Sequence, residues 1–332
     1  MSATTAFLLH PAASLHDTGW GHPDHQGRLR ALASTVGRDM LTLHGRAEQV
    51  APGEASEEDV LRVHERAHVA RVRAAVGRAG EGDLVRLDVD TVVSPASWDA
   101  VMGSSGALLT ALGAVADGRF RNAFVATRPP GHHATPDRAM GFCLFNHVAM
   151  GARWLQAHGH AERVLIVDWD VHHGNGTQEI FESDASVFYL SLHQSPHYPG
   201  TGRETETGSG PGRGFTRNVE LRARTSRAAY LERYESALDD VFGRFDPDFV
   251  LVSSGFDCLA GDPLGGLLLE PEDLHAMTRG LMARAGARCD GRVAVALEGG
   301  YDPPRTGAGA VAVIRALAGV DPAADARPDP GA

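Results

Sequence analysis

The segment Asp168–His172, DWDVH, places two carboxylates and an imidazole at alternating positions, directly after the apolar run Val164–Val167. Alternate residues of a strand point to the same side, so these side chains would project together from the carboxyl end of a buried strand. Sheets of α/β proteins bind ligands at that end, and neighbouring carboxylates are costly to bury unless a cation joins them. We interpret the segment as part of a metal site. The alternative is a pair of capping aspartates with a core histidine, because ion-pair networks can imitate a site.

A third candidate ligand, Asp257, follows the apolar run Phe249–Val252. Alone, an aspartate in this place would be interpreted as a turn or cap residue. With Asp170 and His172 it gives an Asp-His-Asp set, and three protein ligands with an open fourth position are typical of catalytic zinc. Carboxylate oxygens also bind Fe²⁺, Mn²⁺ or Co²⁺, so the residue types leave the choice between these ions and Zn²⁺ open.

Two adjacent histidines, His132 and His133, follow the Pro-Pro-Gly of the segment Arg128–Ala134, RPPGHHA. Proline and glycine fix a turn that would present both rings after a further strand. A neutral imidazole is the usual general base near pH 7. Solvated loop histidines are common, but here Asp168 and Asn175 are available to orient the rings.

The segment Leu297–Tyr301, LEGGY, ends a sixth apolar run with two glycines and a tyrosine. The glycines would let the backbone approach another group closely. The hydroxyl of Tyr301 could donate a hydrogen bond to a developing oxyanion. An ordinary half-buried tyrosine is the alternative.

A second metal motif, His64-Glu65-Arg66-Ala67-His68, matches the zinc pattern H-E-x-x-H in a predicted helix. Its extended form is missing, because Arg71 and Ala74 occupy the places of the further glycine and histidine. We interpret it as a chance match on a partly solvated helix face, since five-residue motifs often match by accident.

Six short, continuously apolar runs predict strands that are covered on both faces. They alternate with segments of helical character, which favours a three-layer α/β fold. Ser94 before Pro95 and Glu270 before Pro271 are predicted helix starts. The predicted strands are Ala6–Leu9, Ala123–Ala126, Val164–Val167, Val187–Leu192, Phe249–Val252 and Val293–Leu297. The predicted helices are Gly27–Val36, Glu57–Val76, Pro95–Ala116, Val148–His158, Ser226–Phe242, Pro271–Ala285 and Thr306–Ala318.

Composition narrows the class of protein. Acidic residues outnumber basic ones by 42 to 31, a formal charge of -11, so the basic footprint of a nucleic-acid-binding protein is missing. Three widely spaced cysteines suggest neither a disulfide framework nor a cysteine zinc site and fit a cytoplasmic protein. We expect no signal peptide and no membrane span. We expect one domain over residues 1–320 and a C-terminal tail over residues 321–332.

The chain resembles the histone deacetylase family, in particular its class II-like bacterial members, the histone deacetylase-like amidohydrolases and acetylpolyamine amidohydrolases. The resemblance runs from about His22 to about Ala318 and rests on seven motifs in the order of the family. These are GHPDHQGRL (Gly21–Leu29), RPPGHHA (Arg128–Ala134), GFCLFNHVA (Gly141–Ala149), DWDVHHGNGT (Asp168–Thr177), SLHQSPHYPGTG (Ser191–Gly202), GFDCLAGDPLGG (Gly255–Gly266) and LEGGY (Leu297–Tyr301).

The resemblance implies a three-layer α/β/α arginase/deacetylase fold with a central, mainly parallel eight-stranded sheet. It implies a Zn²⁺ ion held by Asp170, His172 and Asp257. It also implies tandem catalytic histidines, His132 with the partner Asp168 and His133 with the partner Asn175. Class I members have aspartate where this chain has Asn175, so the second pair is expected to be less basic. Tyr301 matches the tyrosine that polarises the substrate carbonyl.

The resemblance also implies a substrate tunnel and a structural cation. Phe142 matches one aromatic wall of an acyl-lysine tunnel, and Tyr198 is a looser match to the opposite wall, where phenylalanine is usual. Gly141 and Gly299 are assigned to the same tunnel. Family members hold a monovalent cation, usually K⁺, and the matching residues are Asp168, Asp170, His172, Ser191 and Leu192.

The expected activity is deacetylation of acetylated lysine side chains or related acetylated amines, with release of acetate. Acetylpolyamine hydrolysis is the alternative within the family. An arginase-like ureohydrolase, which needs two manganese ions and further carboxylates, and a non-catalytic acyl-lysine-binding or sensor protein are the alternatives outside it. Rim residues such as Asp17, Trp20, Asp90 and His197 are candidates for setting specificity. No nucleic-acid or membrane partner is expected, and the oligomeric state is left open, a homo-oligomer included.

Overall fold

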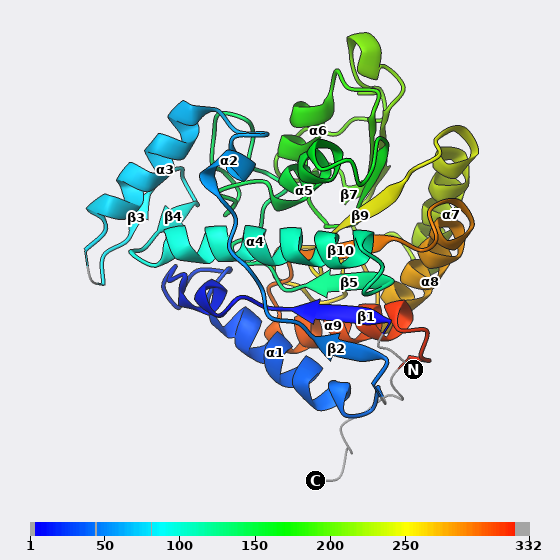
Figure 1. Cartoon of the computed structure of the whole chain (residues 1–332), viewed down its shortest axis with the longest axis horizontal. Coiled ribbons are helices and arrows are strands. Elements are labelled where there is room, and N and C mark those ends of the chain that lie inside the picture. Colours follow the sequence, from blue (N-terminus) through cyan, green and yellow to red (C-terminus); the bar gives the residue numbers. More distant parts are fainter. Residues whose placement is uncertain (1–3, 44, 81, 323–332) are drawn as a thin grey trace.

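The computed structural model describes residues 4–322 except 44 and 81 (Figure 1). Its central sheet has eight strands in the order β2-β1-β5-β10-β9-β6-β7-β8, and every neighbouring pair is parallel. Parallel neighbours require crossover connections, which helices provide here. The strands are β1 (Thr5–Leu8), β2 (Ala47–Gln49), β5 (Asn122–Val125), β6 (Val164–Asp168), β7 (Val187–Gln194), β8 (Thr216–Leu221), β9 (Phe249–Ser254) and β10 (Val293–Leu297), with a separate antiparallel pair of β3 (Val85–Arg86) and β4 (Val92–Val93).

Helices cover both faces of the sheet, which makes three layers (Figure 1). Side chains from α1, α7, α8 and α9 pack on one face, and those from α3, α4 and α5 on the other. The helices are α1 (Gly27–Met40), α2 (Glu57–Val60), α3 (Arg66–Arg78), α4 (Ser97–Ala116), α5 (His147–Ala157), α6 (Asn175–Phe181), α7 (Arg227–Arg244), α8 (Pro271–Arg288) and α9 (Pro303–Leu317).

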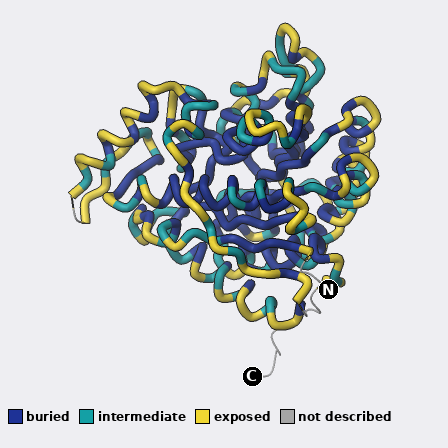
Figure 2. Tube along the Cα trace, viewed as in Figure 1, coloured by how far each residue is buried: buried dark blue, intermediate teal, exposed yellow. Residues whose placement is uncertain are grey.

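The alternation of side chains along each strand supplies both hydrophobic cores. In β6, Leu165 and Val167 belong to one core, whereas Val164 and Ile166 belong to the other. The strands of the sheet centre are therefore buried on both faces, as Figure 2 shows in dark blue. This double burial explains why their sequences are continuously apolar.

The predicted fold class is confirmed, and so are all six predicted strands. The two edge strands, β2 and β8, were not predicted. Their sequences, AEQ and TRNVEL, are short or alternate between apolar and polar residues, because an edge strand is only partly covered. Residues 323–332 of the predicted tail lie outside the described residues, and the domain boundaries stay a prediction.

Three predictions about helices were wrong in detail. The expected helix Glu57–Val76 is divided into α2 and α3, and the short helix α6 was missed. Ser94 does not cap α4, because the helix begins at Ser97, two residues after the predicted start at Pro95. Its hydroxyl instead accepts a hydrogen bond from the amide of Asp17 at 3.1 Å. The start of α8 is confirmed, because Pro271 is its first residue and the amide of Glu270 donates to Asp273.

Helix α4 is long and apolar enough to cross a membrane by length and composition, contrary to the sequence expectation. Within the fold, however, 78% of its apolar window is buried. It packs on the sheet and against α5, so its apolar character is explained by its place in the core.

Candidate active site

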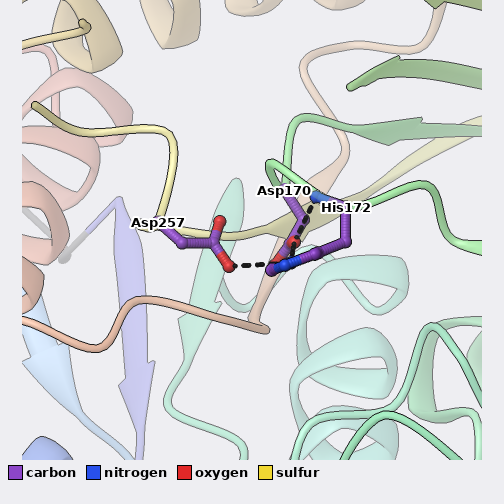
Figure 3. A group of neighbouring side chains, drawn as sticks. All are labelled: Asp170, His172 and Asp257. Carbon is purple, nitrogen blue, oxygen red and sulfur yellow. Dashed lines mark hydrogen bonds and ion pairs between the residues drawn. The ribbon is translucent and has the colours of Figure 1, made fainter. Parts of the chain in front are cut away.

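Asp170, His172 and Asp257 meet at the carboxyl edge of the sheet, where β6 and β9 are neighbours (Figure 3). Nδ1 of His172 lies 3.0 Å from Oδ1 of Asp170 and 3.3 Å from Oδ2 of Asp257. One ligand atom from each residue lies within 4.8 Å of the other two, and all three residues are buried. The structure thus brings together the three ligands that the sequence predicts.

Main-chain amides hold the outer oxygens of both carboxylates. The amide of Val171 donates to Oδ1 of Asp257 at 2.9 Å, and the amide of Gly299 donates to Oδ2 of Asp170 at 2.8 Å. The remaining oxygens face His172. Oδ2 of Asp257 is buried and, apart from the His172 Nδ1 atom at 3.3 Å, has no hydrogen-bond partner among the described residues, which is a costly state for a carboxylate oxygen.

The geometry and the charges of this cluster fit a divalent cation. Ligand atoms of a tetrahedral zinc site lie about 3.3 Å apart, given bonds of about 2.0 Å, and the two separations above agree with this. Burial and the nearby Asp170 carboxylate raise the pKa of Asp257 to about 7. A bound cation would remove this repulsion and supply a partner for the buried Oδ2 atom.

Two glycines allow the backbone to lie directly against these carboxylates. A Cβ atom on Gly255 would overlap Oδ2 of Asp170, and a Cβ atom on Gly299 would overlap Oδ2 of Asp257. Gly299 was assigned to the substrate tunnel. The structure places it against the carboxylates, and the described residues that line the cavity do not include it.

His132 lies in a strongly acidic environment. Its Nδ1 atom lies 3.0 Å from Oδ2 of Asp168, which also accepts a hydrogen bond from the Tyr189 hydroxyl at 2.9 Å. Its Nε2 atom lies 3.8 Å from Oδ1 of Asp170. Burial lowers the pKa of His132, but the carboxylates of Asp168 and Asp170 outweigh burial and raise it to about 10. His132 is therefore protonated when the cation is absent.

His133 lies in a different environment. Its Nδ1 atom is 2.8 Å from Oδ1 of Asn175, an uncharged acceptor at the start of α6. The Asn175 amide nitrogen is in turn 3.4 Å from the carbonyl oxygen of His133, which fixes the orientation of the amide. Burial and the neighbouring His132 and His172 rings hold the pKa of His133 well below its usual value. His133 is therefore neutral near pH 7, with Nε2 free to accept a proton.

Glu298, which was not assigned a role from the sequence, holds the turn that carries these histidines. Its Oε2 atom accepts hydrogen bonds from the amides of Gly131 at 2.6 Å and His132 at 3.2 Å. Its other oxygen accepts from the Ser253 hydroxyl at 2.9 Å. The LEGGY segment thus orients the RPPGHHA segment through one buried carboxylate.

A cavity of about 480 Å³ opens above the cation ligands. Phe142 and Tyr198, the two residues assigned to the walls, line it, and Gly141, His133 and His172 line it as well. Asp90 and His197, two of the suggested rim residues, also belong to the lining. His197 stacks on His172 with ring centroids 4.8 Å apart.

The wall residue Phe142 has an unusual backbone conformation. Its φ angle is 68° and that of Gly141 is 56°, so two successive residues are in the left-handed region. A Cβ atom on Gly141 would overlap the His133 ring. The amide of Phe142 donates to the Thr91 hydroxyl at 3.0 Å, which ties this turn to the β3–β4 segment.

Tyr301 lies beside the cavity with its ring packed between two other groups. Phe142 meets it edge-on at 5.7 Å, and the Arg28 guanidinium lies 4.7 Å from its ring centre. Burial raises the pKa of Tyr301 well above its usual value, so the hydroxyl keeps its proton. Arg28 also donates to the carbonyl oxygens of Glu298 and Gly300, which fixes the loop that carries Tyr301.

Behind this loop lies a buried ion network that was not predicted from the sequence. Oδ1 of Asp24 contacts Arg28 at 2.5 Å and Arg128 at 3.1 Å, and all three side chains are fully buried. Arg128 also donates to the carbonyl oxygen of His16 at 2.7 Å. The network joins the segment before α1 to the RPPGHHA segment and to the LEGGY segment. The i, i+4 spacing of Asp24 and Arg28 could have suggested part of it.

The residues assigned to K⁺ are also close together in the structure. Asp168 is the last residue of β6 and pairs with Ser191 of β7, and Asp170 and His172 lie in the turn that follows β6. The Ser191 hydroxyl lies 2.9 Å from Nδ1 of His193, and Leu192 follows it in β7. This neighbourhood agrees with the expected set, and the ion itself stays a prediction.

The H-E-x-x-H motif has a structural role. Nδ1 of His64 bonds the Thr135 carbonyl at 2.9 Å and its Nε2 accepts from the Asn146 amide at 2.8 Å, while His68 bonds the Leu144 carbonyl. Both rings are buried, so the expectation of a partly solvated face was wrong. They hold the segment that carries Phe142.

Comparison with known proteins places this arrangement in a family. Residues 22–317 match the family described as histone deacetylase domain, so the chain belongs to the histone deacetylase family. It is a hydrolase that acts on amide bonds. A probable deacetylase of Archaeoglobus fulgidus is 35% identical, over 98% of this chain and 89% of the relative. The histone deacetylase-like amidohydrolase of Pseudomonas aeruginosa is 37% identical, over 93% of this chain and 79% of the relative.

Plant proteins are similar too. Histone deacetylase 15 of Arabidopsis thaliana is 39% identical over 91% of this chain, which spans 53% of that relative. The crystal structure of the HDA15 HD domain superposes with a TM-score of 0.88 at 36% identity, over 98% of this chain and 91% of that chain. The predicted family and fold are therefore confirmed.

Proposed function

We propose that this chain is a zinc-dependent deacetylase that hydrolyses N-acetyl groups of acetylated lysine side chains or related acetylated amines and releases acetate. The observation that carries the proposal is the buried Asp170, His172 and Asp257 cluster at the base of a cavity lined by His133 and Tyr301. The cavity offers a general base, a phenol donor and a cation site within one small space. Metal-assisted amide hydrolysis uses a base, an oxyanion donor and a cation of this kind.

The two hydrogen-bonding side chains have distinct roles in the proposal. The Tyr301 hydroxyl, which keeps its proton, donates to the substrate carbonyl oxygen and holds the oxyanion that forms there. Neutral His133 takes a proton from the attacking water through Nε2. The histidine pair then passes a proton to the leaving amine. Asp168 and Asn175 hold the two rings in place for these transfers.

Asp170, His172 and Asp257 are the residues that would hold zinc, which supplies a Lewis acid for the carbonyl and lowers the pKa of a bound water. The same oxygen-rich set accommodates Fe²⁺, Mn²⁺ or Co²⁺. We also propose a structural K⁺ beside Asp168, Asp170, His172, Ser191 and Leu192, whose proximity supports it.

Two other functions are compatible with parts of the site. Acetylpolyamine hydrolysis would use the same chemistry and differs only in what fits the mouth of the cavity. A sensor that binds acyl-lysine without hydrolysis would need no Tyr301 hydroxyl and no neutral His133, yet both line the cavity. We therefore favour catalysis.

The test is acetate release from an acetyl-lysine peptide, N-acetylputrescine and N-acetylspermidine by the zinc-loaded protein. All 31 basic residues of the chain are arginine, so an amine-reactive dye detects the lysine amine released from an N-terminally blocked acetyl-lysine peptide with little background from the protein. A hydroxamate should inhibit the reaction. Acetate from at least one substrate would support the proposal, and binding of all three without acetate release would favour the sensor.

A further inference from the structure

Three of the large apolar side chains that the fold leaves exposed lie on two segments that reach the wall of the cavity, one before α1 and one between β3 and β4. Among the described residues, Trp20 is 67% exposed, Leu84 is 40% exposed and Val89 is 80% exposed. We call these three residues the apolar rim. Exposed apolar groups that lie together on a surface commonly mark an interaction site.

Contacts join the apolar rim to one wall of the cavity. Leu84 covers Gly19, because a Cβ atom there would lie 3.7 Å from the leucine Cδ1 atom. His22 bonds the carbonyl oxygen of Asp90 at 3.0 Å and meets the Phe142 ring at 4.6 Å. The segment before α1 and the β3–β4 segment therefore form one continuous surface that ends at Phe142.

The tryptophan of the rim is held in place from one side. Its ring lies 5.5 Å from the His25 ring, which precedes α1, and 5.8 Å from the Arg30 guanidinium in the first turn of α1. The rest of the indole faces solvent. A ring that is fixed in this way can bury a partner side chain at little entropic cost.

Carboxylates accompany the apolar groups. Asp17, Asp88 and Asp90 form no ion pair with the described basic residues. Asp90 lines the cavity itself. Two arginines are also present, because Arg30 lies beside the Trp20 ring and Arg86 donates to the Val89 carbonyl oxygen at 2.7 Å. The surface thus presents large apolar groups and three carboxylates without an ion pair next to the place where the acylated amine enters. A partner that carries both apolar and cationic side chains would match it.

We propose that the apolar rim binds the residues next to the acyl-lysine of a polypeptide substrate and selects large apolar side chains there, with cationic residues nearby. This inference rests on the proposed deacetylase function and specifies its substrate. A polyamine would satisfy the carboxylates but would leave the indole of Trp20 and the side chain of Val89 without an apolar partner. A polypeptide with a leucine or aromatic residue beside the acyl-lysine satisfies both features.

The test compares two acetyl-lysine pentapeptides with arginine at both ends, one with leucine and one with serine on each side of the acetyl-lysine. We expect the wild type to favour the leucine peptide in kcat/KM by about five- to tenfold, the effect of burying roughly half of a leucine side chain. Trp20→Ser and Val89→Ser should remove most of this preference through KM. Leu41→Ser is the matched control, because Leu41 is about as exposed as Val89 but lies at the far end of α1. This variant should keep the preference for the leucine peptide.

Several outcomes would overturn the inference while leaving the deacetylase function intact. These are equal kcat/KM for the two peptides, an unchanged preference in Trp20→Ser, or hydrolysis of N-acetylputrescine with neither peptide cleaved. Light scattering that shows a dimer in the wild type and a monomer in Val89→Ser would assign the rim to contact with a second copy of the chain instead.

If no substrate is hydrolysed, the deacetylase function fails. In that case, fluorescence anisotropy of labelled peptides still measures how tightly the protein binds the leucine and the serine peptide. Equal affinity for the two peptides would overturn the proposed role of the apolar rim.

Discussion

The two adjacent histidines differ in what lies behind each ring. Asp168 lies behind His132, whereas an amide, Asn175, lies behind His133. The carboxylate gives His132 a raised pKa, whereas burial and the neighbouring His132 and His172 rings lower the pKa of His133, and Asn175 adds no charge to oppose them. One ring is thus prepared to carry a proton and the other to accept one, although the residues are neighbours in the chain.

Replacing Asn175 with aspartate tests this difference. A carboxylate 2.8 Å from Nδ1 would raise the pKa of His133 by about 1 to 3 units. Because the neutral ring is the active form, the acidic limb of the pH–rate profile should move to higher pH by the same amount. A profile of kcat/KM for the zinc-loaded variant measures this shift, and an unchanged acidic limb would show that His133 is not the base.

Tyr301 gives a second prediction at the residue scale. Tyr301→Phe removes only the hydroxyl and should lower kcat by about 10²–10³-fold, the usual effect of losing one oxyanion donor. The zinc content per chain should stay that of the wild type, because the Tyr301 hydroxyl is not among the predicted ligands. Metal analysis beside steady-state kinetics checks both parts. A loss of zinc in the variant would instead make Tyr301 part of the cation site.

The chemistry-bearing residues were predictable because they follow directly on apolar strands. Asp170, His172 and Asp257 each come within a few residues of the carboxyl end of a strand. Because these ends lie at the same edge of a parallel sheet, their position alone predicts that the three side chains lie close together. Glu298 and Asp24 were not predicted, because their partners are main-chain amides or distant arginines that no local pattern reveals.

At the scale of elements, the loops that carry the cation ligands pack closely because glycine backbone lies directly against the ligand carboxylates. Gly299→Ala would push a methyl group into Oδ2 of Asp257 and Oδ2 of Asp170. We expect zinc affinity to fall at least tenfold while the fold is retained, because only the ligand positions change. Competition with a fluorescent zinc chelator measures the affinity. Gly77→Ala, in open space on α3, is the control, and an equal loss there would contradict the explanation.

The buried Asp24, Arg28 and Arg128 network gives a prediction about stability. Asp24→Asn leaves two buried arginines without their shared counter-charge and should lower the free energy of unfolding by about 3–5 kcal/mol. Glu204→Gln, which breaks an exposed pair with Arg233, should change it by less than about 1 kcal/mol. Urea unfolding at pH 7 compares the two variants. Similar small losses would mean that the network is dispensable for folding.

For the whole molecule, the sequence predicted the sheet centre better than its edges. Central strands such as β6 and β9 are covered on both faces and are apolar throughout, so composition alone identifies them. The edge strand β8 has polar residues at intervals, and β2 has three residues only, so neither has a distinct pattern. The order of the strands depends on long-range packing, so it was not predicted from the sequence.

The central claim is that one cation, held by Asp170, His172 and Asp257, is required for hydrolysis. Titration of metal-free protein with zinc, with acetate release from an acetyl-lysine peptide as the readout, tests it most directly. Activity should rise linearly and reach its maximum at one zinc per chain, while Asp257→Asn should stay inactive over the same range. Full activity without metal, or a maximum only at two ions per chain as in a ureohydrolase, would contradict the claim.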